Sequence, residues 1–202
     1  MELEKLQSLR LAGILLAATA LFAALLMHNH PHGGDGAGII RWVHGGLLAM
    51  IIVQPAVLAL LGRALGWNML TALALASFSF GSLGAVLAGT INGFVVPTIA
   101  AYPAGEIGPG VAQLAWEMNQ ALATNGAVAA GLGIALFGAA LWRASWRVIG
   151  TLGVLAGAVP AALLVAGATD MRFYGAMFTY ITQLLWLAGL GGVLAREAGR
   201  AG

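Results

Sequence analysis

Six long apolar stretches dominate this sequence and restrict its fold more than any other feature. They lie between charged or glycine- and proline-rich breaks, at residues 11–28, 42–62, 69–97, 111–142, 148–168 and 173–194. A membrane-spanning helix needs about 20 apolar residues, and each stretch is close to or above that length. The stretches are too long for transmembrane strands and lack strict alternation of apolar and polar residues. The sequence therefore predicts an all-α, polytopic membrane protein, in which residues 1–202 form a single domain with a bundle of six transmembrane helices.

The scarcity of charge supports a membrane location. Only 8% of the 202 residues are charged and 60% are hydrophobic, whereas a soluble domain has about 25% charged residues. We therefore expect the lipid bilayer to be the main partner of this chain. The absence of cysteine excludes disulfides, thiolate metal sites and cysteine nucleophiles. The nine Lys and Arg residues are scattered and form no basic stripe for nucleic acid.

The positions of the basic residues predict the orientation in the membrane. One side of the predicted bundle holds Lys5, Arg10, Arg63, Arg143, Arg147, Arg196 and Arg200. The other side holds only Arg41 and Arg172. Because cytoplasmic loops carry the excess of Lys and Arg, the sequence predicts an N-in/C-in topology with both termini in the cytoplasm. We expect a multi-pass protein of the bacterial inner (cytoplasmic) membrane, with segments 29–41, 98–110 and 169–172 at the periplasmic face.

Small residues recur at a spacing of four inside the apolar stretches. The pairs are Gly89 with Gly93, Ala127 with Gly131, and Gly153 with Gly157. In lipid, such pairs let helix backbones approach closely. They therefore predict contacts between helices.

Polar side chains collect at the predicted periplasmic boundary and form a candidate vestibule. Its residues are His44, Asn92, Gln113, Glu117, Gln120, Asp170 and Arg172. The stretch 111–142 would be about 48 Å long as a helix, against a hydrocarbon core of about 30 Å. Its outer end and that of stretch 69–97 are therefore expected to project as a helical hairpin. The alternative is that these polar groups only face water, with Asp170 and Arg172 as a surface ion pair.

The leading functional hypothesis is that the protein binds or transports a small molecule through this vestibule. Binding or transport of the molecule is expected to be linked to protons in one form of the hypothesis. His44 is the expected proton-exchanging group, with Glu117 as its partner; its alternative role is a structural hydrogen bond to Asn92. Three uncharged polar residues lie deeper in the predicted bundle and are expected to find polar partners inside it: Gln54, Asn125 and Gln183.

A second hypothesis concerns the four histidines. His28, His30 and His32 alternate in one loop, and His44 follows nearby. Imidazole is a ligand for Zn, Cu or Ni, so a metal site at the periplasmic face is an alternative; otherwise these residues are incidental to a polar loop. A third hypothesis is a membrane scaffold that binds a membrane protein partner or a second copy of itself. No nucleophile and base occur in a recognisable arrangement, so no catalytic residue is predicted, and no cofactor apart from the alternative metal.

The order of features also resembles a known pattern. Arg10 to Gly13 opens the first stretch, Arg147 to Gly150 opens the fifth, His44 begins the second, and the segment 94–97 ends the third. In these features the chain resembles an uncharacterised family of bacterial six-helix integral membrane proteins. The resemblance implies a six-helix fold and an inner-membrane location. It implies no activity and no site residues, and the histidines at 28, 30 and 32 are not part of the pattern.

Overall fold

The computed structural model is helical throughout the residues it describes, which are all except 1, 32–35, 104 and 201–202. The elements are α1 (Glu2–His28), α2 (Ala37–Ala64), α3 (Met69–Thr90), a π-helix η1 (Ile91–Val95), α4 (Val96–Ala100), α5 (Pro109–Arg143), α6 (Arg147–Val165) and α7 (Phe173–Arg200). No strand occurs in this part of the chain. The all-α prediction is therefore confirmed.

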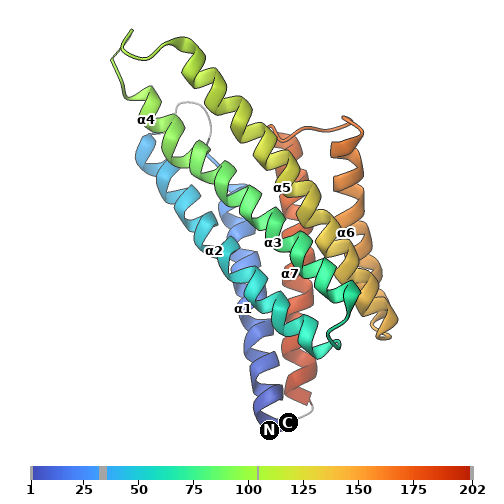
Figure 1. Cartoon of the computed structure of the whole chain (residues 1–202). Coiled ribbons are helices and arrows are strands. Elements are labelled where there is room, and N and C mark those ends of the chain that lie inside the picture. Colours follow the sequence, from blue (N-terminus) through green and yellow to red (C-terminus); the bar gives the residue numbers. More distant parts are fainter. Residues whose placement is uncertain (1, 32–35, 104, 201–202) are drawn as a thin grey trace.

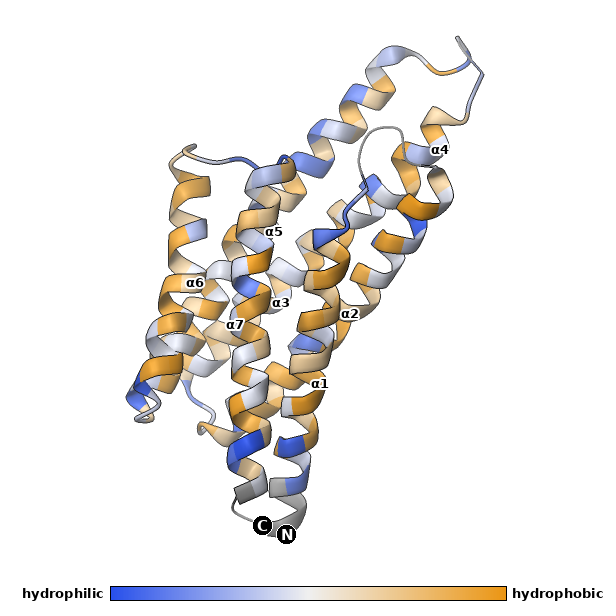
Figure 2. Cartoon of the chain, turned by 180° about the vertical axis from the view of Figure 1, so that it is seen from behind, coloured by the Kyte–Doolittle hydropathy of each residue, from blue (hydrophilic) through white to orange (hydrophobic). Residues whose placement is uncertain are grey.

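Six helical spans are long and apolar enough to cross a membrane, because α3, η1 and α4 run on as one span from Met69 to Ala100. Large apolar side chains point outward along the spans; Trp42 and Phe80 are 67% and 66% exposed. Figure 2 shows hydrophobic residues along the middle of the helices and hydrophilic ones concentrated toward their ends. Such a surface suits lipid, so the chain has the character of a multi-pass membrane protein.

The six spans form a closed ring in the order α1, α2, α3, α5, α6 and α7, with α7 packed against α1. The first and last helices thus lie side by side, and both termini are at the same end of the bundle (Figure 1). Arg63 lies in the last turn of α2 at that end, and Arg143 lies in the last turn of α5. Arg41 lies near the start of α2, at the opposite end. The positive-inside rule applied to this arrangement makes the terminal end the cytoplasmic one, which remains a prediction.

Small residues form the tightest contacts between helices. A Cβ atom added to Gly81 of α3 would lie 2.6 Å from the Ala130 Cα atom of α5. A Cβ atom on Gly131 would lie 2.6 Å from the Gly157 carbonyl oxygen of α6. Backbone on both sides leaves no room for a side chain, so these seams exist only because the residues are small.

The fifth apolar stretch ends earlier than predicted, at Val165 instead of residue 168. Gly167 has φ +67°, and the Gly167 and Ala168 amides donate to the carbonyls of Leu164 and Leu163. This is the Schellman arrangement that closes a helix at a left-handed residue. The α5 helix ends in the same way with Ser145, a non-glycine residue with φ +71°.

The long third and fourth spans do project, as the lengths of their sequences predict. Figure 1 shows α4 and the beginning of α5 extending beyond the other helices on the side opposite the termini. Gly105, with φ +92°, lies in the turn that joins them. The main hydrophobic core lies nearer the terminal end, where Leu58, Phe137, Leu141 and other large side chains are fully buried.

Candidate functional site

A π-helical segment brings two of the predicted vestibule residues together. In η1 (Ile91–Val95) the helix that began as α3 widens before it resumes as α4. Asn92 in this segment places its Nδ2 atom 3.2 Å from the Nε2 atom of His44 on α2. Gly93 beside it has no side chain, and a Cβ atom there would collide with His44. Short π segments occur frequently at functional sites, and here the segment positions an amide against an imidazole.

The hydrogen bonds of His44 define its donor and acceptor atoms. Its Nδ1 atom lies 2.8 Å from the Ile40 carbonyl oxygen, which only accepts, so Nδ1 carries the proton. Nε2 of the neutral ring then accepts from the Asn92 amide. His44 is only 3% exposed, and the His30 ring packs edge-on against it with centroids 4.9 Å apart. Both ring nitrogens of His44 are therefore engaged within the protein.

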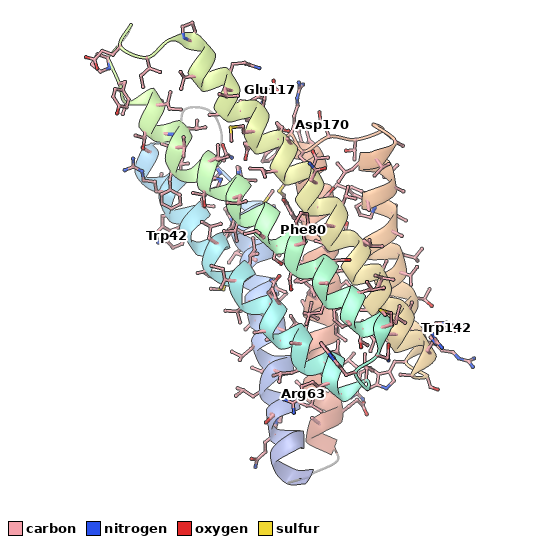
Figure 3. All side chains as sticks on the ribbon, viewed as in Figure 1. Trp42, Arg63, Phe80, Glu117, Trp142 and Asp170 are labelled. Atoms are coloured by element: carbon pink, nitrogen blue, oxygen red, sulfur yellow. The ribbon has the colours of Figure 1, made fainter. Side chains whose placement is uncertain are left out.

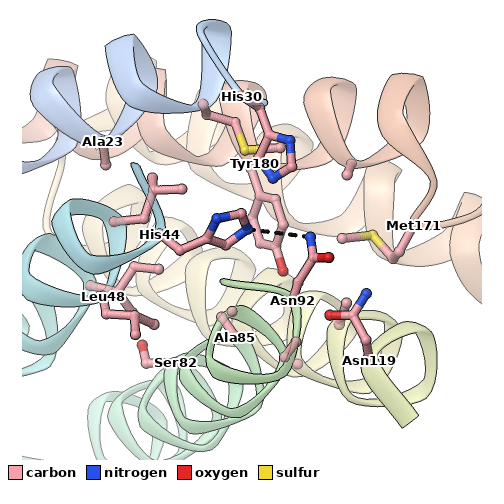
Figure 4. Close-up of a pocket in the computed structure, with 18 of the residues that line it drawn as sticks. Ala23, His30, His44, Leu48, Ser82, Ala85, Asn92, Asn119, Met171 and Tyr180 are labelled. Atoms are coloured by element: carbon pink, nitrogen blue, oxygen red, sulfur yellow. Dashed lines mark hydrogen bonds between the residues drawn. The ribbon is translucent and has the colours of Figure 1, made fainter. Parts of the chain in front are cut away.

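The His44–Asn92 pair lies on the wall of a cavity of about 670 Å³. Residues of α1, α2, α3, η1, α4, α5 and α7 line it, so it occupies the centre of the helix ring (Figure 4). Most of the lining is alanine, leucine and other apolar residues, and Asn119 and Tyr180 add further polar groups. The cavity runs from Ile40 and Ala100, at the end of the bundle opposite the termini, to Phe78 and Leu187, which belong to the main core.

Four of the predicted vestibule residues, Glu117, Gln120, Asp170 and Arg172, line a second hollow of about 440 Å³. We call it the outer hollow because it lies toward the end of the bundle opposite the termini. Glu117 lies there, exposed, and its Oε1 atom accepts a hydrogen bond from Gln113 Nε2 at 2.6 Å. Asp170 is near Glu117 in Figure 3 and forms an ion pair with Arg172, whose Nε lies 3.5 Å from Asp170 Oδ2. Only Gln120 and Arg172 among the predicted vestibule residues line both hollows. The structure thus divides the predicted vestibule in two, and the contacts of His44 do not include Glu117.

The histidines do not all meet. His30 and His44 are in ring contact, while His28 is exposed at the end of α1 and His32 lies outside the described residues. Within the described ranges, no group of three His, Cys, Asp or Glu residues is placed to hold a metal ion. The metal hypothesis therefore stays a sequence prediction.

Two cavity residues, Asn119 and Tyr180, were not singled out from the sequence. Asn119 is 6% exposed and lies on the α5 face that continues through Ala123, Gly126 and Ala130. That repeat of small residues was the available signal, since small side chains at helical spacing leave space as well as contacts. Asn125, by contrast, was expected inside the bundle and is exposed. It sits on the outer hollow, because a helix turns it away from the Asn119 face.

No protein-family model, curated protein or solved structure matches this chain. The function must therefore be argued from the geometry of the site itself.

Proposed function

We propose that this protein binds a small, mainly apolar molecule in the central cavity and is a membrane carrier in its outward-open state. The observation that carries the proposal is the 670 Å³ cavity with the His44–Asn92 pair on its wall. Ligand pockets typically enclose about 300–1,000 Å³, with apolar walls and a few placed polar groups. A π-helical segment, a feature frequent at functional sites, lies beside the cavity at η1, where Asn92 belongs to the lining.

The polar groups of the cavity would orient the ligand. The amide of Asn92 uses one hydrogen for His44 and keeps its carbonyl oxygen for another donor. Asn119, on the cavity wall, makes no hydrogen bond with another described residue. A ligand with one hydrogen-bonding group would meet both amides there. The packed core beneath the cavity would close the path to the cytoplasm in this state.

Cysteine labelling tests whether the cavity is open to the outside. The chain has no cysteine, so Ser82→Cys introduces a single thiol into the cavity wall. We expect a membrane-impermeant methanethiosulfonate reagent to label Ser82→Cys in intact cells, and methyl decanoate to slow the labelling. Ser79→Cys, on the same helix but outside the cavity lining, is the matched control. Absence of labelling from the outer side would contradict the outward-open assignment.

Filling the cavity tests binding directly. Ala85 lies on the cavity wall, whereas Ala158 is exposed on α6, which contributes nothing to the lining among the described residues. We expect methyl decanoate to raise the Tm of the wild type and of Ala158→Phe, since a ligand that binds only the folded state stabilises it. Ala85→Phe should lose most of that rise. An equal rise in both variants would refute binding in the cavity.

We assign any coupling between ligand binding and protonation to His44. Imidazole is the side chain that exchanges protons between about pH 5 and pH 8. We expect methyl decanoate binding to change over this range in the wild type and to be flat in His44→Gln. If methyl decanoate binding to the wild type does not change with pH, His44 does not couple protons to binding.

A further inference from the structure

The floor of the cavity holds a polar group that forms no hydrogen bond with any described residue. Gln54 of α2 lines the cavity and is only 2% exposed. Its Nε2 atom has no hydrogen-bond partner among the described residues. Leaving a buried amide unpaired costs stability comparable to the loss of a hydrogen bond or more, so such a group at a cavity floor points to an acceptor supplied from outside the protein.

Gln54 lies well below the His44–Asn92 pair. The two residues are ten positions apart on α2, which corresponds to about 15 Å along the helix axis. Gln183 of α7 also lines the cavity, ten positions beyond Phe173, whose ring is 6.5 Å from that of His30. Its Nε2 atom already donates to the Ala127 carbonyl oxygen. The cavity therefore has an upper polar level at His44 and Asn92 and a lower one at the two glutamines.

The wall between the two levels is mainly apolar, with Tyr180 of α7 adding a hydroxyl. Leu47, Leu48 and Ile51 on α2 line this part of the cavity together with Ala85 and Ala88 on α3. Arg172, near the outer end, is the only Lys, Arg, Asp or Glu among the described residues that line the cavity. An ion inside would lose its hydration without a counter-charge. The interior thus suits an uncharged molecule with an apolar middle.

From this arrangement we infer the class of ligand, an inference that rests on the proposed binding function. The ligand is an elongated, uncharged molecule with an apolar middle and a hydrogen-bonding group at each end. A carbonyl-type oxygen at its inner end accepts a hydrogen bond from Gln54 Nε2. The group at its other end reaches the amides of Asn92 and Asn119.

Three probes separate the contributions of the two ends. Dimethyl sebacate carries an ester at both ends, methyl decanoate carries one, and decane carries none. Binding is measured by titration calorimetry on the protein in lipid nanodiscs, with empty nanodiscs subtracted. We expect the wild type to bind dimethyl sebacate about tenfold more tightly than methyl decanoate, because one buried hydrogen bond is worth roughly a factor of ten, and to bind decane weakest.

Replacing the glutamine should remove this preference. Gln54→Met keeps the length of the side chain but has no amide, and Gln54→Leu tests the same loss with another apolar shape. In both we expect the tenfold preference for the diester to fall to about twofold or less. Thr179→Val is the matched control, because the Thr179 hydroxyl is also buried, has no hydrogen-bond partner among the described residues and lies outside the cavity lining. It should keep the full preference.

The outcomes distinguish this inference from the proposed function. If the wild type binds none of the three probes, binding of apolar molecules in the cavity itself is wrong. If the wild type binds both esters equally, or if Gln54→Met keeps the full preference, the ligand class is wrong while the cavity remains a binding site. In that case water, and not a ligand, meets the Gln54 amide.

Discussion

The two halves of the bundle are built from the same helices but packed differently. In the half near the termini, Leu58, Leu141 and Phe137 are fully buried and fill the centre of the ring. In the half away from the termini, called the outer half below, the same helices present Ala85, Ala123 and other small residues to a large cavity. Small residues thus serve two purposes in this chain, since they close the seams between neighbouring helices and also keep the centre of the ring open.

The residues that stabilise the fold and the residues that line the cavity thus lie in different halves of the same helices. Interiors gain their stability from dense packing, and a space without partner atoms gives up those contacts. The packed inner half would therefore hold the fold together while the outer half tolerates a cavity. We expect four sets of substitutions to reveal this separation, with the greatest loss of stability in the packed core.

The first prediction compares the same substitution in the two halves of α2. Leu58→Ala should lower the free energy of unfolding by about 4 kcal/mol, because it opens a void in a filled core. Leu48→Ala should cost only about 1 kcal/mol, because that side chain already borders the cavity and loses mainly its transfer energy. Unfolding in mild detergent measures both. Equal losses would show that the halves are packed alike.

The second prediction concerns the seam between α3 and α5. Gly81→Ala should cost about 3 kcal/mol, because the new Cβ atom would meet backbone atoms of α5 that cannot move aside. The control is Gly192→Ala, where nothing lies within 4 Å of the added atom. This exposed helical glycine should instead gain about 0.5–1 kcal/mol. A similar sign in both variants, measured by the same unfolding assay, would contradict the assignment of the seam.

The third prediction tests the π-helical segment of the outer half. Gly93→Ala would push a methyl group against the stem of the His44 side chain, at a cost of about 2 kcal/mol. It should also weaken methyl decanoate binding by displacing His44 from Asn92. Gly89→Ala, one turn away, meets only the end of the flexible Leu48 side chain at 3.1 Å. Stability and binding that are unchanged in Gly93→Ala would argue against the His44–Asn92 arrangement.

The smallest effect is expected at the helix ends. Ser145→Gly should stabilise the protein by about 1 kcal/mol, because Ser145 has φ +71°, a left-handed conformation that strains residues with a Cβ atom. Gly167→Ala should destabilise it by a similar amount, because Gly167 has φ +67°. Thermal unfolding of the two variants should shift in opposite directions. A shift in the same direction would mean that one of these turns is not closed as described.

Much of the fold could be predicted from the sequence, because lipid imposes simple rules. Each span must satisfy its own backbone hydrogen bonds, so an apolar stretch of sufficient length becomes a helix. The end of α6 differs from the prediction because Gly167 adopts a left-handed conformation, and hydropathy gives no sign of a left-handed turn. The π segment at Asn92 was missed because no residue pattern distinguishes it from continuous helix.

The site was predictable only in part. His44 and Asn92 were chosen because they are polar and lie at the same depth, and they are in hydrogen-bonding contact. Glu117 and Asp170 satisfied the same criterion, yet they lie on the outer hollow. Depth along a helix is read from the sequence, whereas the direction in which a side chain points around the ring is not. For the same reason, the sequence does not indicate that Asn119 lines the cavity.

Six apolar helices, their connections and the placement of basic residues at one end follow from the sequence, because these properties depend on local composition. The order of the helices around the ring, the pairing of α1 with α7 and the cavity lined by His44 and Gln54 depend on contacts between distant segments and are seen only in the folded chain. The physical reason is that lipid and protein interior are equally apolar. Hydrophobicity can drive a segment into the membrane, but it cannot tell a helix which neighbour to choose; close packing of small residues and the pairing of buried polar groups make that choice.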